Sequence, residues 1–357
     1  MNIVVLIPAL NPDEKLIEYV KQLADYGFPR ILVVNDGSAA SYDAIFSRCA
    51  ALDSCTVLRH EVNGGKGRAL KTGMRHYLET LSGYDGIVTG DADGQHALAD
   101  TAGLAALVSE HPDSLILGVR DFDEPHVPRR SRLGNKITSS VFRLFYGGRK
   151  LRDTQTGLRG IPNALIPWLC EIGGDRFEFE MNMLMECRLR KVPVLETPIQ
   201  TIYIDENSSS HFNPVLDSFR VYWLLIGRFL RYVLSSLVSY FIDITLYTLL
   251  VQLSILNGLL FGVLIATAAA RVVSSVCNYI LNKKIVFHKH GDFWRSFVRY
   301  GLSVMFVLLC SAGFVSVLGS LFSLDASETV LIKLCVDALL GLVSYTLQKK
   351  WVFRTPK

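Results

Sequence analysis

The sequence predicts an α/β domain with a doubly wound, mostly parallel sheet, followed by an interfacial amphipathic helix and four transmembrane helices in two tandem hairpins. Two observations predict this order. Short apolar runs alternate with helical stretches in the first half, and four long apolar blocks fill the remainder. Half of the 357 residues are hydrophobic and the mean hydropathy is +0.30, too apolar for an ordinary soluble protein. We expect domain boundaries at 1–207, 208–229 and 230–357.

Strand-like and helical patterns alternate from the N-terminus. NIVVLIPAL, RILVVND, CTVLRH and GIVTGDADG predict strands, because each is short, apolar and bounded by turn residues. The first of these lacks the basic region and cleavage site of a signal peptide, so we expect it to be a strand. Helical patterns lie over about 13–26, from about 42 and over about 67–81. In such βαβαβ sheets, ligands bind at the carboxyl ends of the strands.

Polar signals follow three of these predicted strands. They are Asn11, the NDGS stretch at 35–38 and GDADGQH at 90–96. One Asp-Gly pair is usually only a turn, but three polar ends at one sheet edge predict a ligand site. Asp91 and Asp93 are like charges that repel unless a cation lies between them.

A glycine-rich turn, NGGKGRAL at 63–70, opens the third predicted helix. Its spacing fits neither a P-loop nor a dinucleotide fingerprint. The N–H groups at a helix start can still hold an anion, and Lys66 would add positive charge near a nucleotide.

Four apolar blocks, roughly 230–253, 257–281, 300–322 and 329–348, each supply about the 20 residues that a membrane-spanning helix needs. Lys and Arg precede the first block, separate the second from the third and follow the fourth. The other two connections, QLSILNG and SLDASE, contain neither. The positive-inside rule therefore predicts that both termini and the N-terminal domain are cytoplasmic.

Two segments of the membrane half are repeated. RYVLSSLVSYF at 231–241 resembles RYGLSVMFVLL at 299–309, and NYILNKKIVF at 278–287 resembles SYTLQKKWVF at 344–353. The repeat predicts two helical hairpins in the same orientation. An anchor, a lipid-handling domain and a transporter core all remain open.

Three ionisable residues lie deep in the apolar blocks, on the order of 16–18 Å from the cytoplasmic face. They are Asp243, Arg271 and Asp337. Unpaired charges at that depth are costly, so we expect Arg271 to pair with Asp243, Asp337 or both. The charges serve either helix packing or lipid headgroup handling. Lys333, nearer the outer end, is expected to snorkel to the interface.

The segment 208–229 predicts a helix that begins near Asn213 and Pro214 and carries Phe219 and Trp223 near one face. Such a helix would lie in the membrane surface. Packing against the core of the N-terminal domain is the alternative.

Charge and cysteine content give no sign of a nucleic-acid partner or of a metal site built from cysteines. The net charge of +4 gives no reason to expect a nucleic-acid partner. The seven cysteines are scattered without metal-ligand spacing, which is typical of reduced core thiols.

The motifs IPALNPDEKL, VVNDGS, NGGKGRAL, GDADGQH and LRDTQTGLRG, in this order, resemble an inverting family 2 glycosyltransferase of the GT-A fold. The branch resembled is the polyprenyl-phosphate type, similar to dolichol-phosphate mannose synthases. The C-terminal hairpins with NKKIVF and QKKWVF resemble a GtrA-type membrane domain. Two features depart from the family pattern: Leu10 and Pro12 replace a frequent aromatic residue and glutamate, and Gly94 replaces a frequent leucine.

The resemblance implies that Asp91 and Asp93 form an Asp-x-Asp element for Mg²⁺ or Mn²⁺, because hard oxygen ligands suit both ions. Gln95 would support that geometry, and Asp36 would hold the nucleoside. The implied donor-binding set is Pro8, Asn11, Asp36, Lys66, Asp91, Ala92, Asp93 and Gln95.

A lipid monophosphate acceptor is already largely nucleophilic at neutral pH, since its second pKa is about 6. It therefore needs positioning by guanidinium groups more than a general base. We expect Arg120 and Arg130 to be catalytic phosphate clamps, together with Arg129 and Arg132. A basic patch for anionic lipid headgroups is the alternative. His211 either meets the lipid phosphate or caps a helix.

Four further residues are predicted to support the site: Asp153, Gln155, Glu178 and Glu180. Asp153 and Gln155 either line the donor or acceptor pocket or form a turn. The segment 176–186 predicts a helix from which Glu178 or Glu180 would face the site.

The predicted function is transfer, with inversion, of a sugar from a nucleotide sugar to a polyprenyl phosphate on the cytoplasmic leaflet. UDP-glucose, UDP-N-acetylglucosamine and GDP-mannose remain open as donors, as does a homo-oligomer. A processive polysaccharide synthase is an alternative, although no Gln-x-x-Arg-Trp motif occurs. A lipid-linked sugar flippase or transporter is another.

Overall fold

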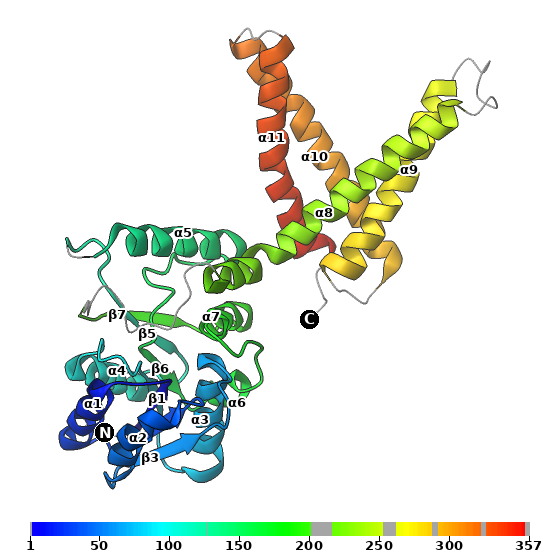
Figure 1. The fold of residues 1–357 in the computed structure, drawn as a ribbon. Coiled ribbons are helices and arrows are strands. Elements are labelled where there is room, and N and C mark those ends of the chain that lie inside the picture. Colours follow the sequence, from blue (N-terminus) through cyan, green and yellow to red (C-terminus); the bar gives the residue numbers. More distant parts are fainter. Residues whose placement is uncertain are drawn as a thin grey trace. The chain divides into compact units, whose positions relative to one another are not determined.

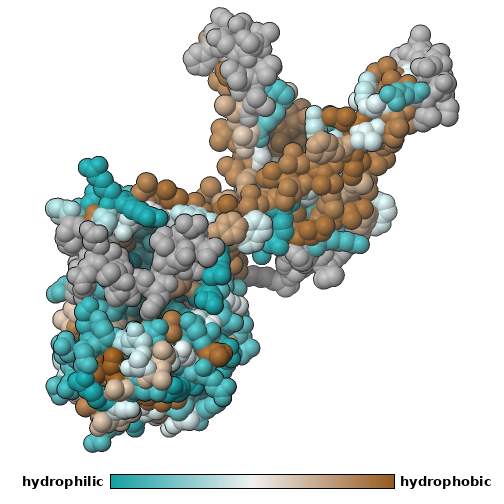
Figure 2. Space-filling view, viewed as in Figure 1, coloured by the Kyte–Doolittle hydropathy of each residue, from teal (hydrophilic) through white to brown (hydrophobic). Residues whose placement is uncertain are grey.

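The computed structural model describes residues 2–125, 127–200, 216–252, 262–287, 292–322 and 326–353 (Figure 1). The chain divides into two compact units, Met1–Leu225 and Ile226–Lys357. Figure 2 shows mainly hydrophilic residues on the visible face of the first unit and mainly hydrophobic residues on the helices of the second.

The described residues of the first unit contain a seven-stranded sheet in the order β3-β2-β1-β4-β6-β5-β7. β6 runs antiparallel to both of its neighbours, and every other pair is parallel. The sheet is therefore mixed, and mostly parallel as predicted. The strands are β1 (Ile3–Ala9), β2 (Arg30–Asn35), β3 (Cys55–Arg59), β4 (Gly86–Thr89), β5 (Leu115–Val119), β6 (Arg159–Pro162) and β7 (Val194–Pro198).

Helices cover both faces of this sheet. α1, α2 and α4 share one hydrophobic core with Val5 and Ile7 of β1, and Leu6 between them packs against α3 on the other face. The helices of this unit are α1 (Glu14–Tyr26), α2 (Asp43–Ala50), α3 (Lys66–Thr80), α4 (Leu98–Glu110), α5 (Arg129–Tyr146), α6 (Ile166–Leu169) and α7 (Glu178–Arg190). The predicted βαβαβ order is confirmed.

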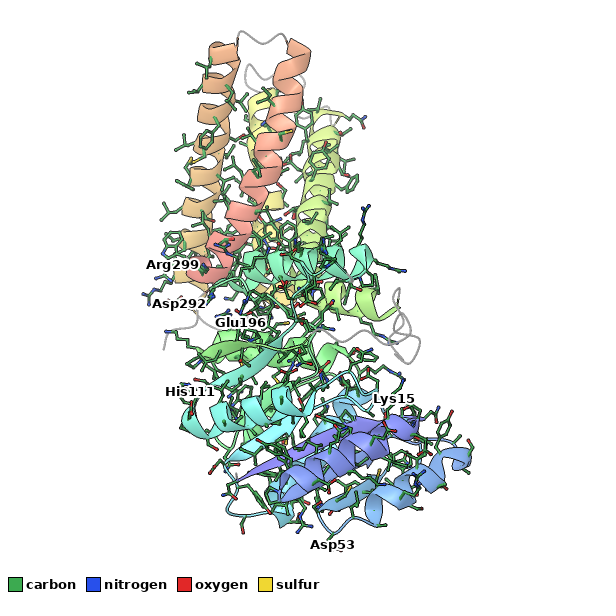
Figure 3. The ribbon with its side chains drawn as sticks, turned by 90° about the vertical axis from the view of Figure 1, so that its left-hand side faces the viewer. Lys15, Asp53, His111, Glu196, Asp292 and Arg299 are labelled. Carbon is green, nitrogen blue, oxygen red and sulfur yellow. The ribbon has the colours of Figure 1, made fainter. Side chains whose placement is uncertain are left out.

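The strand register brings three polar loops to one edge. Ala9 lies opposite Asn35, and Leu6 lies opposite Thr89, so β1, β2 and β4 end close together. Figure 3 shows Lys15 at this end of the sheet and His111 at the opposite end. The residues that follow β1, β2 and β4 therefore lie at the edge where a ligand site was predicted.

The second unit is helical. α8 (Leu216–Gln252) enters it, and α9 (Gly262–Leu281), α10 (Phe293–Phe322) and α11 (Ala326–Leu347) follow. Among the described residues, two stretches are long and apolar enough to cross a membrane, Phe219–Gln252 and Phe293–Leu318. The prediction of four transmembrane helices therefore stays a prediction, and these two stretches are consistent with it by length and composition.

The sequence repeat gives matching local structure. α9 and α11 both continue into a π-helical turn, Asn282–Val286 and Gln348–Val352. The buried Asn282 Nδ2 donates to the buried Gln348 Oε1 at 3.0 Å, so one amide from each hairpin forms a polar clasp. Figure 3 shows Asp292 and Arg299 at the start of α10; Asp292 directly precedes this helix and Arg299 lies on its second turn.

The deep charges pair differently in the two hairpins. Arg271 Nη1 lies 3.5 Å from Asp243 Oδ2, which confirms one of the two predicted pairings. Asp337 instead accepts from Lys333 Nζ at 2.9 Å and from Ser311 Oγ at 2.5 Å. The ammonium of Lys333 is paired with a carboxylate one turn away on α11, and its snorkelling to the interface stays a prediction.

The helix predicted over 208–229 is described from Leu216, where α8 begins; Asn213, Pro214 and His211 lie outside the described residues. Phe219 and Trp223 are exposed and stack at 6.0 Å. Tyr222 OH lies 3.2 Å from Thr138 Oγ1 of α5. The start of α8, up to Leu225, thus belongs to the first unit and contacts α5, while Phe219 and Trp223 are exposed.

Candidate active site

A pocket of about 320 Å³ opens at the carboxyl edge of β1, β2 and β4. Its lining residues come from the loops after these strands, the start of α3 and the segment before α7. Seven of the eight predicted donor-binding residues line it: Pro8, Asn11, Asp36, Lys66, Asp91, Ala92 and Asp93. Gln95 does not; its backbone N–H donates to Asp93 Oδ1 at 3.0 Å.

The loops after β1 and β2 are tied together. Asn11 has a φ of +46°, a left-handed conformation that asparagine tolerates. Its backbone N–H donates to Ser38 Oγ at 2.9 Å, and its side-chain Oδ1 accepts from the Ala39 N–H at 3.1 Å. The pocket wall is thus fixed by hydrogen bonds between two loops.

Asp36 holds the glycine-rich turn. Its buried carboxylate accepts from the Gly64 N–H at 2.9 Å and the Gly65 N–H at 2.7 Å. His60 Nδ1 lies 2.7 Å from Asp36 Oδ1, and His60 Nε2 lies 2.9 Å from Thr72 Oγ1. Asp36 therefore positions the turn beside the pocket as well as lining it. Sequence reasoning missed His60, which follows a strand without any motif.

Glycine is required at two positions of this turn. Gly65 has a φ of +97°, and a Cβ there would lie 2.5 Å from the Asp175 carbonyl oxygen. A Cβ on Gly67 would lie 2.5 Å from Phe179 Cβ. The turn therefore lies close to the start of α7. This places Lys66, the first residue of α3, between the carboxylates of Asp91 and Glu180.

Lys66 is the cation beside Asp91. Its Nζ lies 2.7 Å from Asp91 Oδ1 and 3.0 Å from Glu180 Oε1, and only 16% of its side chain is exposed. On the other side, His96 Nε2 lies 3.4 Å from Asp91 Oδ2. The repulsion expected between Asp91 and Asp93 is thus offset by the ammonium group of Lys66.

These contacts shift the pKa values of Asp91, Asp93 and Lys66. Burial disfavours the charge on Asp91, but Lys66 and His96 outweigh it and hold the pKa of Asp91 below its usual range. Burial and the charge of Asp91 raise the pKa of Asp93. Burial opposes the charge on Lys66, yet Asp91 and Glu180 raise the pKa of that ammonium. Asp91 and Lys66 therefore form an ionised pair at neutral pH.

Gly157 makes room for Asp91. A Cβ on Gly157 would lie 2.2 Å from Asp91 Oδ2. Thr89 Oγ1 donates to the Gly157 carbonyl oxygen at 2.7 Å, which fixes the end of the TQTG segment against β4. The sequence singled out this segment but not its glycine, since the clash depends on a contact between distant residues.

Arg120 and Asp153 form a buried ion pair. Arg120 Nε donates to Asp153 Oδ2 at 2.8 Å and its Nη2 donates to Oδ1 at 3.3 Å, while Asp153 is fully buried. The guanidinium also lies over the Phe122 ring at 5.1 Å. Gln155 donates its backbone N–H to Asp153 Oδ1 at 2.9 Å. Neither Asp153 nor Gln155 lines the pocket described above.

The other predicted arginines divide into two kinds. Arg132 Nε donates to the Phe122 carbonyl at 2.6 Å and its Nη2 donates to the Glu124 carbonyl at 3.0 Å, so it closes the loop before α5. Arg129 and Arg130, at the first turn of α5, are exposed. Among the described residues, neither side chain has a hydrogen bond or an ion pair.

α5 also carries an exposed apolar face. Leu133, Ile137 and Leu144 are 61%, 43% and 63% exposed, while Asn135 and Phe142 are buried. Spacings of four and seven residues, about one and two helical turns, place the three exposed side chains on one side of the helix.

The two predicted glutamates differ. Glu178 Oε1 accepts from the Asp175 and Arg176 N–H groups at 3.2 and 3.3 Å, so it fixes the turn that precedes α7. Glu180 is buried and pairs with Lys66. Beneath it, the buried Arg159 donates from Nη1 to the Glu180 carbonyl at 2.7 Å, a support that sequence reasoning missed.

The carboxylates of the pocket fit a divalent cation that is bound partly by the protein and partly by substrate phosphates. No group of three or more His, Cys, Asp or Glu side chains in the described ranges is placed to hold a metal. Asp91 and Asp93 supply hard carboxylate oxygens to the pocket, and Mg²⁺ is usually held by one or two carboxylates plus substrate phosphates.

Comparison with known proteins agrees with this geometry. Residues 4–165 match the model of glycosyl transferase family 2, and residues 231–353 match that of the GtrA/DPMS transmembrane domain. An uncharacterized protein of Methanocaldococcus jannaschii is 31% identical over 229 residues, covering 63% of this chain and 91% of that protein.

Two further proteins are similar to part of this chain. The UDP-N-acetylglucosamine–dolichyl-phosphate N-acetylglucosaminyltransferase of Methanococcus voltae is 27% identical over 241 residues, covering 63% of this chain and 94% of that protein. A crystal structure of glucosyl-3-phosphoglycerate synthase from Mycobacterium tuberculosis, with Mn²⁺, UDP and phosphoglyceric acid, has a TM-score of 0.46 and 17% identity, covering 63% of this chain and 78% of that chain.

The protein is therefore a membrane-bound glycosyltransferase. It belongs to glycosyl transferase family 2 and carries a C-terminal GtrA/DPMS transmembrane domain, as its motifs predicted.

Proposed function

We propose that the protein transfers a sugar, with inversion, from a nucleotide-sugar donor to a polyprenyl phosphate on the cytoplasmic leaflet. The observation that carries this proposal is the pocket in which Asp91, Asp93 and Lys66 meet a glycine-rich turn, in a chain with a membrane domain. The named activity of the Methanococcus voltae relative, which transfers N-acetylglucosamine from UDP-N-acetylglucosamine to dolichyl phosphate, supports it.

Asp91 and Asp93 would hold Mg²⁺ or Mn²⁺ together with the donor diphosphate. Such an ion, when bound, neutralises charge on the leaving diphosphate. Asp36 and Asn11, on the loops after β2 and β1, would orient the nucleoside. Lys66 would contribute a second positive charge to the diphosphate.

The acceptor side of the proposal assigns different roles to the arginines. Arg129 and Arg130 would clamp the lipid phosphate, because they are exposed and unengaged among the described residues. Arg120 and Arg132 would instead position the loop that leads to Arg129 and Arg130. The guanidinium of Arg120 binds Asp153, and that of Arg132 binds backbone carbonyls. The role of His211 stays a prediction.

The apolar face of α5 would rest in the membrane surface beside these arginines. Exposed Leu133 and Leu144 suit the boundary between headgroups and acyl chains, and Arg129 and Arg130 suit anionic headgroups. Positive charge at one end of the apolar blocks favours cytoplasmic termini. The domain boundaries at 1–207, 208–229 and 230–357 remain part of this proposal.

The test uses purified full-length protein in detergent. Undecaprenyl or dolichyl phosphate is supplied with UDP-glucose, UDP-N-acetylglucosamine or GDP-mannose, in Mg²⁺, Mn²⁺ or EDTA. We expect one donor to be consumed only when lipid phosphate and metal are both present, giving one sugar per lipid. Long polymer without lipid would instead indicate a processive synthase. Movement of a lipid-linked sugar across vesicles without donor consumption would indicate a transporter.

A further inference from the structure

Lys66 uses the same carboxylate that the metal of the proposed function requires. Its Nζ lies 2.7 Å from Asp91 Oδ1, and both groups line the pocket. A divalent ion such as Mg²⁺ binds carboxylate oxygen at about 2.1 Å and carries twice the charge of an ammonium. An ammonium hydrogen-bonded to that oxygen and a metal ion bound to it would repel each other at close range.

Glu180 gives Lys66 a second partner that does not compete with the metal. It lies 3.0 Å from Lys66 Nζ, it is buried, and it is absent from the pocket lining. Arg159 and the first turns of α7 fix its backbone. The ammonium therefore keeps one carboxylate when it loses the other, so that releasing Asp91 does not leave a buried, unpaired cation.

We propose that Lys66 is an exchangeable counterion of the Asp-x-Asp element: it neutralises Asp91 in the empty pocket and passes from Asp91 to the donor diphosphate when the metal binds. The inference rests on the metal site of the proposed function. It makes Lys66 a positioning residue that couples occupancy by metal to occupancy by nucleotide, with Glu180 as its fixed anchor.

The exchange predicts cooperative binding. Metal alone must displace an ammonium from Asp91, whereas metal with a diphosphate gives that ammonium a new anionic partner. Each ligand should therefore strengthen the binding of the other, by a factor that is the same in both directions. Removing the ammonium should tighten the binding of metal alone and weaken the coupling.

The test measures free Mn²⁺ by electron paramagnetic resonance during titration of full-length protein, with and without UDP or GDP. In Lys66→Met, we expect Mn²⁺ alone to bind about tenfold tighter than in the unchanged protein, the scale of one charge-assisted hydrogen bond. The factor by which the nucleoside diphosphate strengthens Mn²⁺ binding should fall by about the same amount.

Lys66→Met leaves Glu180 unpaired, so a charge-neutral double variant, Lys66→Met/Glu180→Gln, accompanies it. Tighter Mn²⁺ binding in both supports release of Asp91. Tighter binding in the single variant alone overturns the inference, because Glu180 is then acting as a new ligand. Arg68→Met is the matched control, since Arg68 is exposed, lies on the same turn of α3 and is outside the pocket. An equal gain in Arg68→Met would show a general field effect and overturn the inference.

Two outcomes separate this inference from the proposed function. Unchanged Mn²⁺ affinity in Lys66→Met, with loss of binding in Asp93→Asn, overturns the counterion exchange and leaves the metal site intact. Unchanged Mn²⁺ binding in Asp93→Asn overturns the metal site and the exchange together.

Discussion

The donor pocket and the arginine segment, residues 120–132 from the end of β5 into α5, both contain several charges. The two regions use these charges differently. At the pocket, Lys66 and Asp91 form one connected network with Glu180, which lies behind the lining. In the arginine segment, Arg120 binds a buried carboxylate, whereas Arg130 is exposed and unengaged among the described residues.

This difference teaches how charge is divided between folding and binding. Charges that satisfy each other inside the protein must exchange partners before they can bind a ligand. Charges left at the surface can bind without rearrangement. We therefore expect substitutions in the pocket to affect the chemical step most, and substitutions at the start of α5 to affect acceptor affinity.

The largest effect should come from Asp93→Asn. Loss of a carboxylate ligand should lower turnover by about a thousandfold or more. Burial and Asp91 raise the pKa of Asp93, so its ionised form costs stability once the pH rises above the unfolded value near 3.9. The thermal midpoint at pH 7 should therefore stay unchanged or rise. Donor consumption and melting of the purified protein check both results; full activity would refute the metal assignment.

Next in size is Arg120→Ala. It leaves the fully buried Asp153 without its guanidinium, so we expect the free energy of unfolding to fall by about 3 kcal/mol. Arg120→Met/Asp153→Asn should recover part of this loss, because no buried charge remains. A thermal midpoint for Arg120→Ala equal to that of the unchanged protein would show that the pair is not structural.

Gly157→Ala should slow turnover by about a hundredfold, because its Cβ would displace Asp91 from its position. The control is Gly103→Ala, since a Cβ at Gly103 in α4 meets no atom within 4 Å. That control should keep full activity and melt at the same temperature or slightly higher. Equal activity of the two variants would show that Asp91 tolerates displacement.

The smallest effect is expected for Arg130→Ala. The KM for lipid phosphate should rise about tenfold, with little change in donor binding or melting temperature. Arg143→Ala, which removes an exposed charge from the last turn of α5, serves as the control. If both variants raise the KM equally, the helix acts as a general basic patch and not through a specific clamp.

The sequence predicted the fold of the first unit well, because its strands and helices carry strong local patterns. α1, for example, begins after Asp13, which accepts from the Lys15 N–H, and ends at Gly27 with a φ of +98°. The antiparallel β6 was not predicted, since its pairing with β4 and β5 joins distant parts of the chain.

The sequence placed together the residues that follow successive strands, and placed fewer of the others. Asp36, Asp91 and Asp93 line one pocket, as expected where parallel strands end at one edge. Gly157 and Arg159 were missed, because their roles depend on contacts with Asp91 and Glu180 that no local pattern reveals. The sequence could not separate the roles of the arginines. An arginine that binds a backbone carbonyl and one that faces water have no distinguishing local sequence pattern.

The amide clasp of the second unit has a consequence for how a duplicated membrane domain is built. Asn282 and Gln348 are buried, and each hairpin supplies only one of the two. In an isolated hairpin, Asn282 would keep its bonds with Ser235 and Asn278, and Gln348 would keep Ser344, but Gln348 Oε1 would lose its buried donor. A buried amide oxygen that loses its donor in lipid costs about a few kcal/mol. The pair therefore favours association of the two copies over either copy alone.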